Sequence, residues 1–373
     1  MSLDNINKDV EGSNIPEPDM DGMFCSQPFE NLEVDPAGNV RTCCAYWMNE
    51  TIGNLSESSF EDVINSKKAR QIRASIHDGS FIFCNKRTCP RIQSGGDETL
   101  VKISDVKDPR LLNIIENKET RLSNLKFINF LWDLSCNLMC PSCRIGKIIN
   151  TKGEDYNRSL DIQEKVTNYV IENNGDESVI FNITGSGDPF GSKIFRDFLI
   201  NFDGKKHPNI KINLQTNGVM FTRKMWDMMS KCHDNINTIL VSIDAASEET
   251  YDKIRVGGNW KILMENIKML SDFKNDKLFD FLRLDFVVQV QNYKEMPEAV
   301  MLAESLSGVD AISFSIITDW GTWPREEYEK HAVWMESNEK YNDFIRTLRD
   351  PILNSPKCQL GNITEFHRIA HEN

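Results

Sequence analysis

The ten cysteines of the chain fall into two groups and two isolated positions. The tighter group is Cys136, Cys140 and Cys143, in a CxxxCxxC spacing. Three thiolates this close can converge on one soft metal site, and thiolates select iron–sulfur clusters or zinc. Three ligands are one short of a filled tetrahedral set, so one metal position would stay open for a substrate or cofactor. The alternative is a zinc knuckle without its fourth ligand, because no histidine follows at a suitable spacing.

The other group lies early in the chain and consists of Cys25, Cys43, Cys44, Cys84 and Cys89. The polar N-terminus has no signal-peptide core, and no apolar run approaches the roughly 18 residues that span a membrane. We therefore expect a cytoplasmic protein with reduced thiols, in which cysteines serve metal ligation or catalysis rather than disulfides. The isolated Cys232 and Cys358 are expected to be packed thiols, although Cys358 could serve as a hydrogen-atom donor.

Composition describes an ordinary globular chain of 373 residues, with 40% hydrophobic and 27% charged residues. This length predicts one large domain and one smaller one. Forty-three basic residues against 56 acidic ones give a net charge of −13, which repels nucleic acids and anionic membranes. No basic cluster with interleaved aromatic residues offsets this, so we expect neither a nucleic-acid nor a membrane partner.

Six short apolar runs, most of them separated by segments of helix length, predict repeated strand–helix units and a parallel sheet. The runs are FINFLWDL, SVIFNIT, IKINLQT, TILVSID, LRLDFVVQVQ and AISFSII. In each run apolar residues alternate with polar ones, so one face of every strand is polar. A closed eight-stranded barrel fills its interior with Val, Ile and Leu. The pattern therefore favours an open, six-stranded (β/α)6 TIM-like barrel whose lumen holds a polar ligand, over an antiparallel sheet with one wet face.

Four further segments follow the cysteine trio in a fixed order, each near the end of a predicted strand. They are Gly185-Ser186-Gly187-Asp188-Pro189, Gln215-Thr216-Asn217-Gly218, Val241-Ser242-Ile243-Asp244 and Tyr251-Asp252-Lys253-Ile254-Arg255. Together with CxxxCxxC, these segments resemble the signature of the radical SAM superfamily over about Leu125 to Ile317. The chain departs from the family's GGEP motif at Ser186 and Asp188, and Ser142 stands where an aromatic residue is frequent.

The resemblance implies a partial barrel that binds a catalytic 4Fe–4S cluster and S-adenosylmethionine (SAM). Cys136, Cys140 and Cys143 would ligate the cluster, and SAM would chelate its open iron. Reductive cleavage of SAM would give a 5′-deoxyadenosyl radical, with electrons from a flavodoxin- or ferredoxin-type donor. The residues implied to bind SAM are Ser186, Gly187, Asp188, Asn217, Ser242 and Arg255.

The N-terminal group resembles a SPASM or Twitch auxiliary iron–sulfur domain. The similarity rests on a turn, Asp35-Pro-Ala-Gly38, on Cys43 five residues after that glycine, and on Cys84 and Cys89 further on. It implies an auxiliary 4Fe–4S cluster on Cys25, Cys43, Cys84 and Cys89. Cys43 is preferred to Cys44, because alternate residues of a strand face opposite sides. Structural zinc is the alternative occupant, and the domain precedes the barrel, whereas in relatives it usually follows.

The sequence thus predicts a small cysteine-rich α+β domain followed by the barrel. We expect a flexible tail at 1–20, the auxiliary domain at 21–96, a linker at 97–125, the barrel at 126–345 and a closing segment at 346–373. The expected reaction is oxidation of a polar small molecule such as a sugar or cyclitol, with the auxiliary cluster as electron acceptor and Asp285, Gln289 and Gln291 as possible substrate contacts. Peptide modification, epimerisation and a non-catalytic iron–sulfur or zinc scaffold are alternatives.

Overall fold

The computed structural model describes residues 18–372, apart from 174 and 184, and divides into two compact units. Unit 1 comprises the described residues up to 133 together with 152–182, and unit 2 comprises 134–151 and the chain from 183 onward. The predicted tail at 1–20 lies mostly outside the described residues. The first strand and first helix of the predicted barrel belong to unit 1, together with the N-terminal cysteines.

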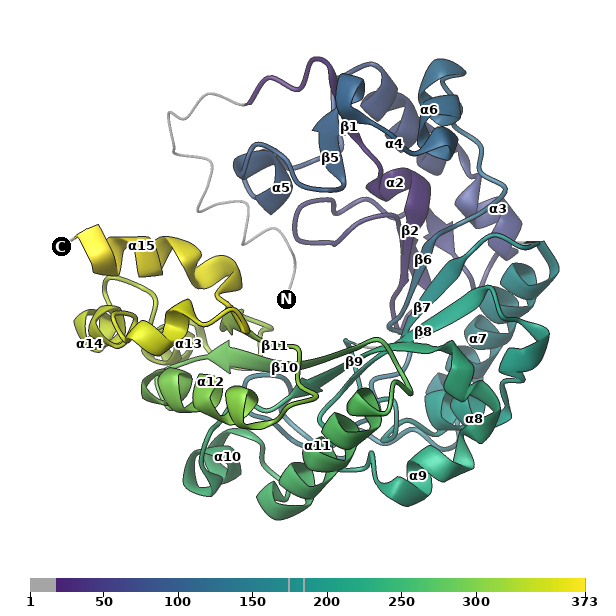
Figure 1. The fold of residues 1–373 in the computed structure, drawn as a ribbon. Coiled ribbons are helices and arrows are strands. Elements are labelled where there is room, and N and C mark those ends of the chain that lie inside the picture. Colours follow the sequence, from purple (N-terminus) through teal and green to yellow (C-terminus); the bar gives the residue numbers. More distant parts are fainter. Residues whose placement is uncertain (1–17, 174, 184, 373) are drawn as a thin grey trace. The chain divides into compact units, whose positions relative to one another are not determined.

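Unit 1 is an α+β assembly of short strands and helices (Figure 1). Its strands are β1 (Met23–Cys25), β2 (Asn31–Val34), β3 (Asn39–Arg41), β4 (Gly53–Asn54), β5 (Leu100–Lys102), β6 (Phe127–Phe130) and β7 (Val179–Ile183, whose last residue falls in unit 2). Its helices are α2 (Gln27–Glu30), α3 (Phe60–Ile64), α4 (Lys67–His77), α5 (Pro90–Gln93), α6 (Pro109–Glu116) and α7 (Glu154–Asn173). The segment predicted as a linker contains β5 and α6, and β5 pairs with β1.

A hairpin of the N-terminal module continues the sheet of the barrel within unit 1. Strand β2 pairs in parallel with β6, from Asn31 opposite Phe127 to Val34 opposite Phe130, and pairs antiparallel with β3. The predicted turn joins β2 to β3: the Asp35 carboxylate accepts hydrogen bonds from two backbone N–H groups and from Asn39, and forms an ion pair with Arg41 at 3.0 Å. Gly38 has φ = 83°, a left-handed conformation that favours glycine.

The polar faces of three neighbouring strands of unit 1 are joined by side-chain amides. Asn129 on β6 donates to Asn31 Oδ1 on β2 at 2.8 Å, and Asn182 on β7 donates to Asn129 Oδ1 at 2.9 Å. The opposite face is apolar and packs under helices, where the rings of Phe60 on α3 and Tyr169 on α7 lie 4.7 Å apart. The polar face predicted for the barrel strands therefore extends onto the N-terminal module.

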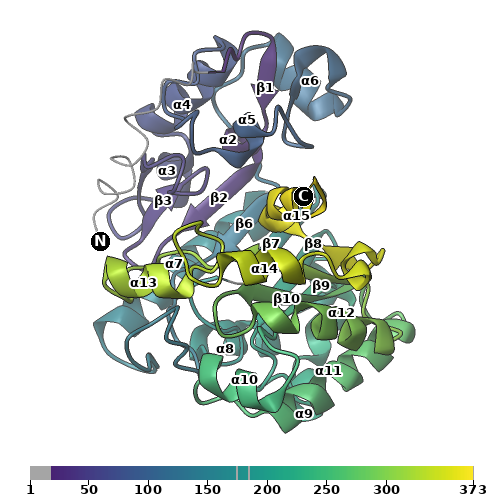
Figure 2. The same cartoon turned by 90° about the vertical axis from the view of Figure 1, so that its left-hand side faces the viewer.

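Unit 2 contains a sheet of parallel strands in sequence order, with helices between them (Figures 1 and 2). The strands are β8 (Ile210–Thr216), β9 (Ile236–Ser242), β10 (Phe281–Val288), β11 (Ala311–Ile316) and β12 (Cys358–Gln359). The helices are α8 (Lys193–Asn201), α9 (Arg223–Met228), α10 (Glu248–Ile254), α11 (Trp260–Asn275), α12 (Met296–Ser305), α13 (Arg325–His331), α14 (Tyr341–Thr347) and α15 (Thr364–Glu372). Parallel pairing confirms the predicted strand–helix repeat.

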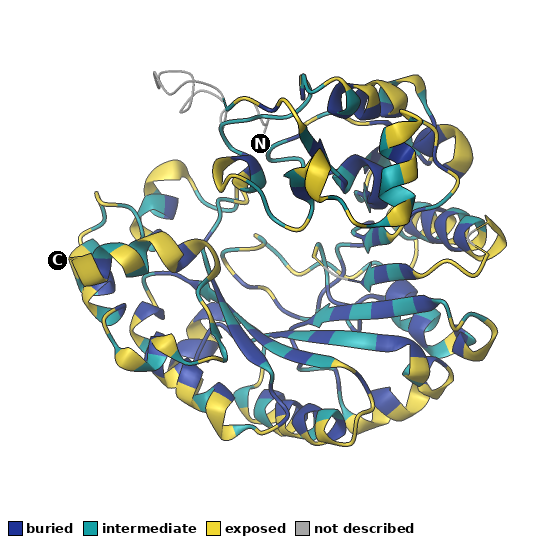
Figure 3. Ribbon diagram, turned by 45° about the horizontal axis from the view of Figure 1, so that its top comes forward, coloured by how far each residue is buried: buried dark blue, intermediate teal, exposed yellow. Residues whose placement is uncertain are grey.

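Burial alternates along these strands, as the sequence predicted, and appears as alternating dark blue and teal bands in Figure 3. One prediction is wrong in its extent: β10 ends at Val288 and does not continue to Gln291. The chain turns there because Asn292 Oδ1 accepts the N–H of Gln289 at 2.8 Å, and the Asn292 side chain donates to the carbonyl of Val287. Gln289 and Gln291 therefore do not share a strand face with Asp285.

The two isolated cysteines lie in unit 2. The Cys232 thiol is fully buried and donates to the carbonyls of Leu199 and Met229, as expected of a packed thiol. Cys358 pairs with Ile312, near the beginning of β11, whereas polar sites in parallel sheets gather at the strand ends. In the part of the chain that the structure describes, no helix has the length and apolarity needed to cross a membrane.

Candidate functional site

The three clustered cysteines lie on one loop of unit 2. Two backbone hydrogen bonds anchor this loop: Cys136 donates to the carbonyl of Ile148 at 2.9 Å, and Met139 donates to that of Val256 at 2.8 Å. The second bond ties the loop to the segment that follows α10, next to Arg255. The loop geometry is therefore held at both of its sides by backbone contacts.

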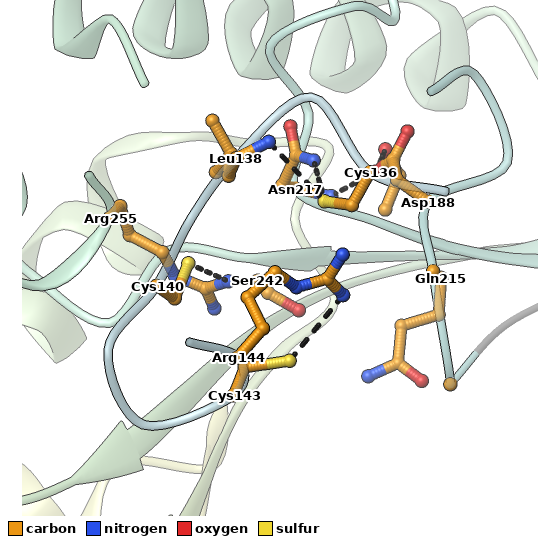
Figure 4. A pocket seen from close by; sticks show the side chains of 13 residues that line it. Cys136, Leu138, Cys140, Cys143, Arg144, Asp188, Gln215, Asn217, Ser242 and Arg255 are labelled. Carbon is orange, nitrogen blue, oxygen red and sulfur yellow. Dashed lines mark hydrogen bonds between the residues drawn. The ribbon is translucent and has the colours of Figure 1, made fainter. Parts of the chain in front are cut away.

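Each sulfur of the trio faces at least one nitrogen donor (Figure 4). Cys136 Sγ accepts from the Leu138 N–H at 3.4 Å and from Asn217 Nδ2 at 3.7 Å. Cys140 Sγ lies 3.9 Å from a guanidinium nitrogen of Arg255, and Cys143 Sγ lies 3.5 Å from one of Arg144. These residues line a cavity of about 120 Å³. Donors aimed at sulfur stabilise thiolate, which is the form that binds iron.

Burial and nearby charges set the acidity of these groups. Burial, followed by the negative charge of Asp188, raises the pKa of Cys136 to about 11. Burial also raises the pKa of Cys140, although the Arg255 guanidinium opposes this shift. Arg255 itself forms an ion pair with Asp244 at 2.8 Å, and despite its burial this attraction raises its pKa. Because both thiols are held protonated without a metal, cluster assembly must release protons.

Asp188 is a buried carboxylate that joins two loops of the site. It is 1% exposed, and its Oδ1 accepts the N–H groups of Phe190 and Gly191. Its Oδ2 accepts the Thr216 hydroxyl and the Asn217 N–H, both at 2.8 Å. The loop after β7 is thereby fastened to the end of β8.

Gly191 is a position where a side chain would disturb the cysteine loop. A Cβ there would lie 2.9 Å from the Asn137 nitrogen and 3.0 Å from Cys136 Cα, both of them backbone atoms. We expect Gly191→Ala to lower the free energy of unfolding by about 1–3 kcal/mol and to reduce loading of the catalytic cluster. Iron content and thermal unfolding of the reconstituted protein measure this effect.

The matched control for that substitution is Gly146→Ala in the same loop region, where an added Cβ would meet no atom within 4 Å. It should load iron as the unaltered chain does. Equal iron content in Gly191→Ala and Gly146→Ala would show that the close approach is unimportant.

The structure brings most of the predicted SAM residues to one cavity. Gly187, Asp188, Asn217, Ser242 and Arg255 line it. Ser186 is not among the lining residues, and its carbonyl accepts a hydrogen bond from Arg144 at 3.1 Å. Further lining residues that we did not predict are Leu138, Arg144, Gly185, Gln215 and Thr216. Arg144 follows the third cysteine directly, which is the signal that could have identified it.

The three predicted substrate residues are divided between two places. Asp285 on β10 pairs with Arg283 at 2.7 Å, and burial raises its pKa. Gln289 and Gln291 line a separate cavity of about 110 Å³, together with Ser142 of the cysteine loop. Two aromatic rings also line it, Trp323 and His331, stacked 4.1 Å apart. The predicted common polar surface is therefore not formed.

Four N-terminal cysteines influence one another electrostatically within unit 1. The pKa values of Cys25, Cys43 and Cys84 are each raised to about 12, first by burial and further by neighbouring cysteines, which include Cys89. The pKa of Cys44 is raised by burial and by Glu33, and no cysteine is among the main influences on it. This arrangement favours Cys43 over Cys44 as a member of the set, which stays a prediction.

Trp47 supplies a hydrogen bond to this set, because its indole N–H donates to Cys43 Sγ at 3.1 Å. Hydrogen bonds to ligand sulfur raise the reduction potential of iron–sulfur clusters. We expect Trp47→Phe to keep the iron but to lower the midpoint potential of the auxiliary cluster by tens of millivolts, on the order of a tenfold change in the redox equilibrium. A redox titration followed by EPR measures this shift.

Trp334→Phe is the control for that substitution, since its buried indole nitrogen has no partner among the described residues and contacts no cysteine sulfur. It should leave the potential unchanged. A Trp47→Phe variant with the original potential would argue against Cys43 as a ligand.

Both cysteine sets suit iron–sulfur clusters in the chemistry of their donors. Each set supplies only cysteine sulfur, and the trio leaves one position of a four-iron cluster without a protein ligand. Among the described residues, no three histidine, cysteine, aspartate or glutamate side chains are arranged to hold a single metal ion. In a cluster each thiolate binds its own iron, so the ligands need not converge on one point.

Comparisons with known proteins agree with both sets. The model of the radical SAM superfamily matches residues 134–303, and the model of the SPASM iron–sulfur cluster-binding domain matches residues 25–90. No curated protein matches the chain.

Among solved structures, the chain is similar to TYW1 with a lysine–pyruvate adduct bound (16% identity, TM-score 0.36, covering 62% of this chain and 72% of that one). It is also similar to Streptococcus suis SuiB bound to S-adenosylmethionine (15%, 0.40, 80% and 64%). A third match is the radical SAM methyltransferase TsrM from Kitasatospora setae, with cobalamin and a [4Fe–4S] cluster bound (12%, 0.37, 61% and 49%). The chain thus spans less than two thirds of SuiB and about half of TsrM.

The family models coincide with the two cysteine sets that the geometry assembles separately. The trio and its cavity lie in the first matched range, and Cys25, Cys43, Cys84 and Cys89 all lie in the second. The cofactors of the protein are therefore a 4Fe–4S cluster, SAM and an auxiliary iron–sulfur cluster. Residues 134–303 therefore form a radical SAM domain, and a SPASM iron–sulfur cluster-binding domain precedes it at residues 25–90.

Proposed function

We propose that this radical SAM enzyme dehydrogenates a polar small molecule such as a sugar or cyclitol, and that its auxiliary cluster accepts the electron. The observation that carries the proposal is the polar strand face of unit 1, which leads from β7 and β6 onto β2. From Asn31 and Glu33 on β2, this face adjoins the N-terminal cysteines.

The contacts along this face follow one another without an apolar break. Asn182, Asn129 and Asn31 are linked by amide hydrogen bonds of 2.9 and 2.8 Å. Glu33 is hydrogen-bonded to Asn31, and its negative charge contributes to raising the pKa of Cys43. Burial raises the pKa of Glu33 itself. Amides and a carboxyl group are donors and acceptors suited to hydroxyl groups.

Cys136, Cys140 and Cys143 would hold the catalytic cluster, which with SAM would supply a radical able to take a hydrogen atom from a substrate carbon. The auxiliary cluster, held by Cys25, Cys43, Cys84 and Cys89, would accept one electron from the remaining substrate radical, and loss of its hydroxyl proton to a base would give a carbonyl group. The protein's part is to hold the reactants in place and exclude water.

We assign roles to the described residues as follows. Cys136, Cys140 and Cys143 ligate the catalytic cluster, and Cys25, Cys43, Cys84 and Cys89 ligate the auxiliary one. Asn217 and Asp188 hold the loops around SAM, since their side chains are engaged with Cys136 and with backbone N–H groups. Gly187, Ser242 and Arg255 border the space that SAM would fill, and Ser186 acts through its carbonyl.

A reductant of the flavodoxin or ferredoxin type is the proposed electron donor. A peptide substrate remains the alternative to a small molecule. Epimerisation through Cys358 is disfavoured, because this residue pairs near the beginning of β11 and not at its end.

The test is anaerobic incubation of the reduced, reconstituted protein with SAM and a panel that includes myo-inositol, scyllo-inositol and glucosamine. The proposal expects at least one of them to raise 5′-deoxyadenosine formation and to yield a product two hydrogens lighter. Cys84→Ala should still cleave SAM but lose that product. Product formation that survives without the auxiliary cluster would contradict the electron-acceptor role. SAM cleavage stimulated by no polyol would contradict the substrate class.

A further inference from the structure

Two arginines contact the cysteine trio, and they differ in how their charge is balanced. Arg255 lies 3.9 Å from Cys140 Sγ, and its charge is paired with Asp244 at 2.8 Å. Arg144 lies 3.5 Å from Cys143 Sγ, and in the part of the chain that the structure describes it has no ion pair with a carboxylate. Arg144 therefore brings a full positive charge to the site.

The guanidinium of Arg144 is fixed by two backbone carbonyls. It donates to Leu134 at 2.9 Å, where the cysteine loop begins, and to Ser186 at 3.1 Å, in the loop after β7. The nitrogen that donates to Ser186, Nη2, also faces Cys143 Sγ, and Figure 4 shows this contact.

The charge matters because reduction adds an electron to a cluster that three thiolates already make negative. Net charge near the cluster and hydrogen bonds to its sulfurs are among the factors that set its potential. We propose that Arg144 raises the reduction potential of the SAM-binding cluster through its unbalanced positive charge at Cys143. Arg255 at Cys140 has a much smaller effect on this potential, because the Asp244 carboxylate balances its charge. Arg144 is thus a positioning and tuning residue. This inference requires the catalytic cluster but not the proposed oxidation.

The experiment is an EPR-monitored redox titration of the reconstituted full chain without substrate. The catalytic cluster is identified as the signal that changes when SAM is added. At the midpoint of the unaltered protein, Arg144→Gln should lower the ratio of reduced to oxidised cluster at least about tenfold, which is 59 mV for one electron. Arg144→Lys keeps the charge and should stay within about threefold. Arg223→Gln is the control, because Arg223 is exposed and already paired with Asp227.

The substitution Asp244→Asn is a second test, and its expected effect is opposite in direction. Asparagine is close in shape to aspartate but carries no charge, so the charge of Arg255 is no longer balanced and the ratio of reduced to oxidised cluster should rise. The proposal is overturned if the ratio of reduced to oxidised cluster in Arg144→Gln stays within about threefold of that in the unaltered protein. It is also overturned if Arg144→Lys has a potential as low as that of Arg144→Gln. If Arg144→Gln fails to retain iron, Asp244→Asn and Arg144→Lys test the proposal in its place. An unchanged or lowered potential in Asp244→Asn then overturns the proposal. So does a roughly tenfold lower ratio of reduced to oxidised cluster in Arg144→Lys.

Discussion

Replacing Cys136, Cys140 and Cys143 together with alanine is expected to abolish SAM cleavage and to lower the iron content from about eight atoms per chain to about four. The reason is that these three residues supply all the thiolates at the cavity that the SAM residues border. The four N-terminal cysteines lie in the other compact unit, so their cluster should persist. Iron and sulfide analysis, with EPR in the presence and absence of SAM, gives the result.

Cys232→Ala is the matched control for the triple variant. This thiol is buried in unit 2 but bonds only to the carbonyls of Leu199 and Met229, so its loss should cost stability without costing iron. A triple variant that kept about eight irons would refute the ligand assignment. Stoichiometric zinc that persisted in the triple variant would make the N-terminal site structural.

Two single substitutions at the adjacent residues Cys43 and Cys44 are expected to differ by the iron of a whole cluster. Cys43→Ala should lose the auxiliary cluster, about four irons per chain, whereas Cys44→Ala should keep it. The charge of Cys25 acts on Cys43 and that of Cys43 acts on Cys84, and the Trp47 indole donates to Cys43, whereas no cysteine is among the main influences on the pKa of Cys44. Iron analysis on the background of the alanine trio reads this cluster alone.

Iron retention in both single variants would mean that either thiol can complete the set. Retention in Cys43→Ala with loss in Cys44→Ala would reverse the assignment. Either result would also remove the basis of the effect expected for Trp47→Phe.

Strand positions were predictable where burial alone decides the pattern. The predicted third run and β8 have the same bounds, Ile210–Thr216, because every second residue of it is buried. The fifth run was predicted too long, since the alternation continues through Gln289 although Asn292 bonds to the backbone and ends the strand. An alternating pattern shows which residues are apolar, but it does not show where a side chain hydrogen-bonds to the backbone and ends the strand.

The cavity residues were predictable where they belong to a motif, and they were missed where tertiary contacts give them their role. Asp188 was recognised as part of a motif, yet two of its four donors, Thr216 and Asn217, come from the end of β8, 28 and 29 residues further along the chain. Arg144 lies outside the recognised motifs and is marked in the sequence only by its place directly after Cys143, and its role arises from the carbonyls of Leu134 and Ser186. The division of the predicted substrate residues likewise depends on where β10 ends.

The parallel pairing of β2 with β6 also bears on how the chain can be shortened. Strand β6 has β2 hydrogen-bonded along it from Asn31 to Val34, and a chain that started after the SPASM domain would leave that row of N–H and C=O groups open. Open edges recruit strands from other molecules, so the truncated protein should self-associate. The N-terminal module therefore also serves as an edge protector, and loss of solubility after its deletion should not be read as loss of its cluster.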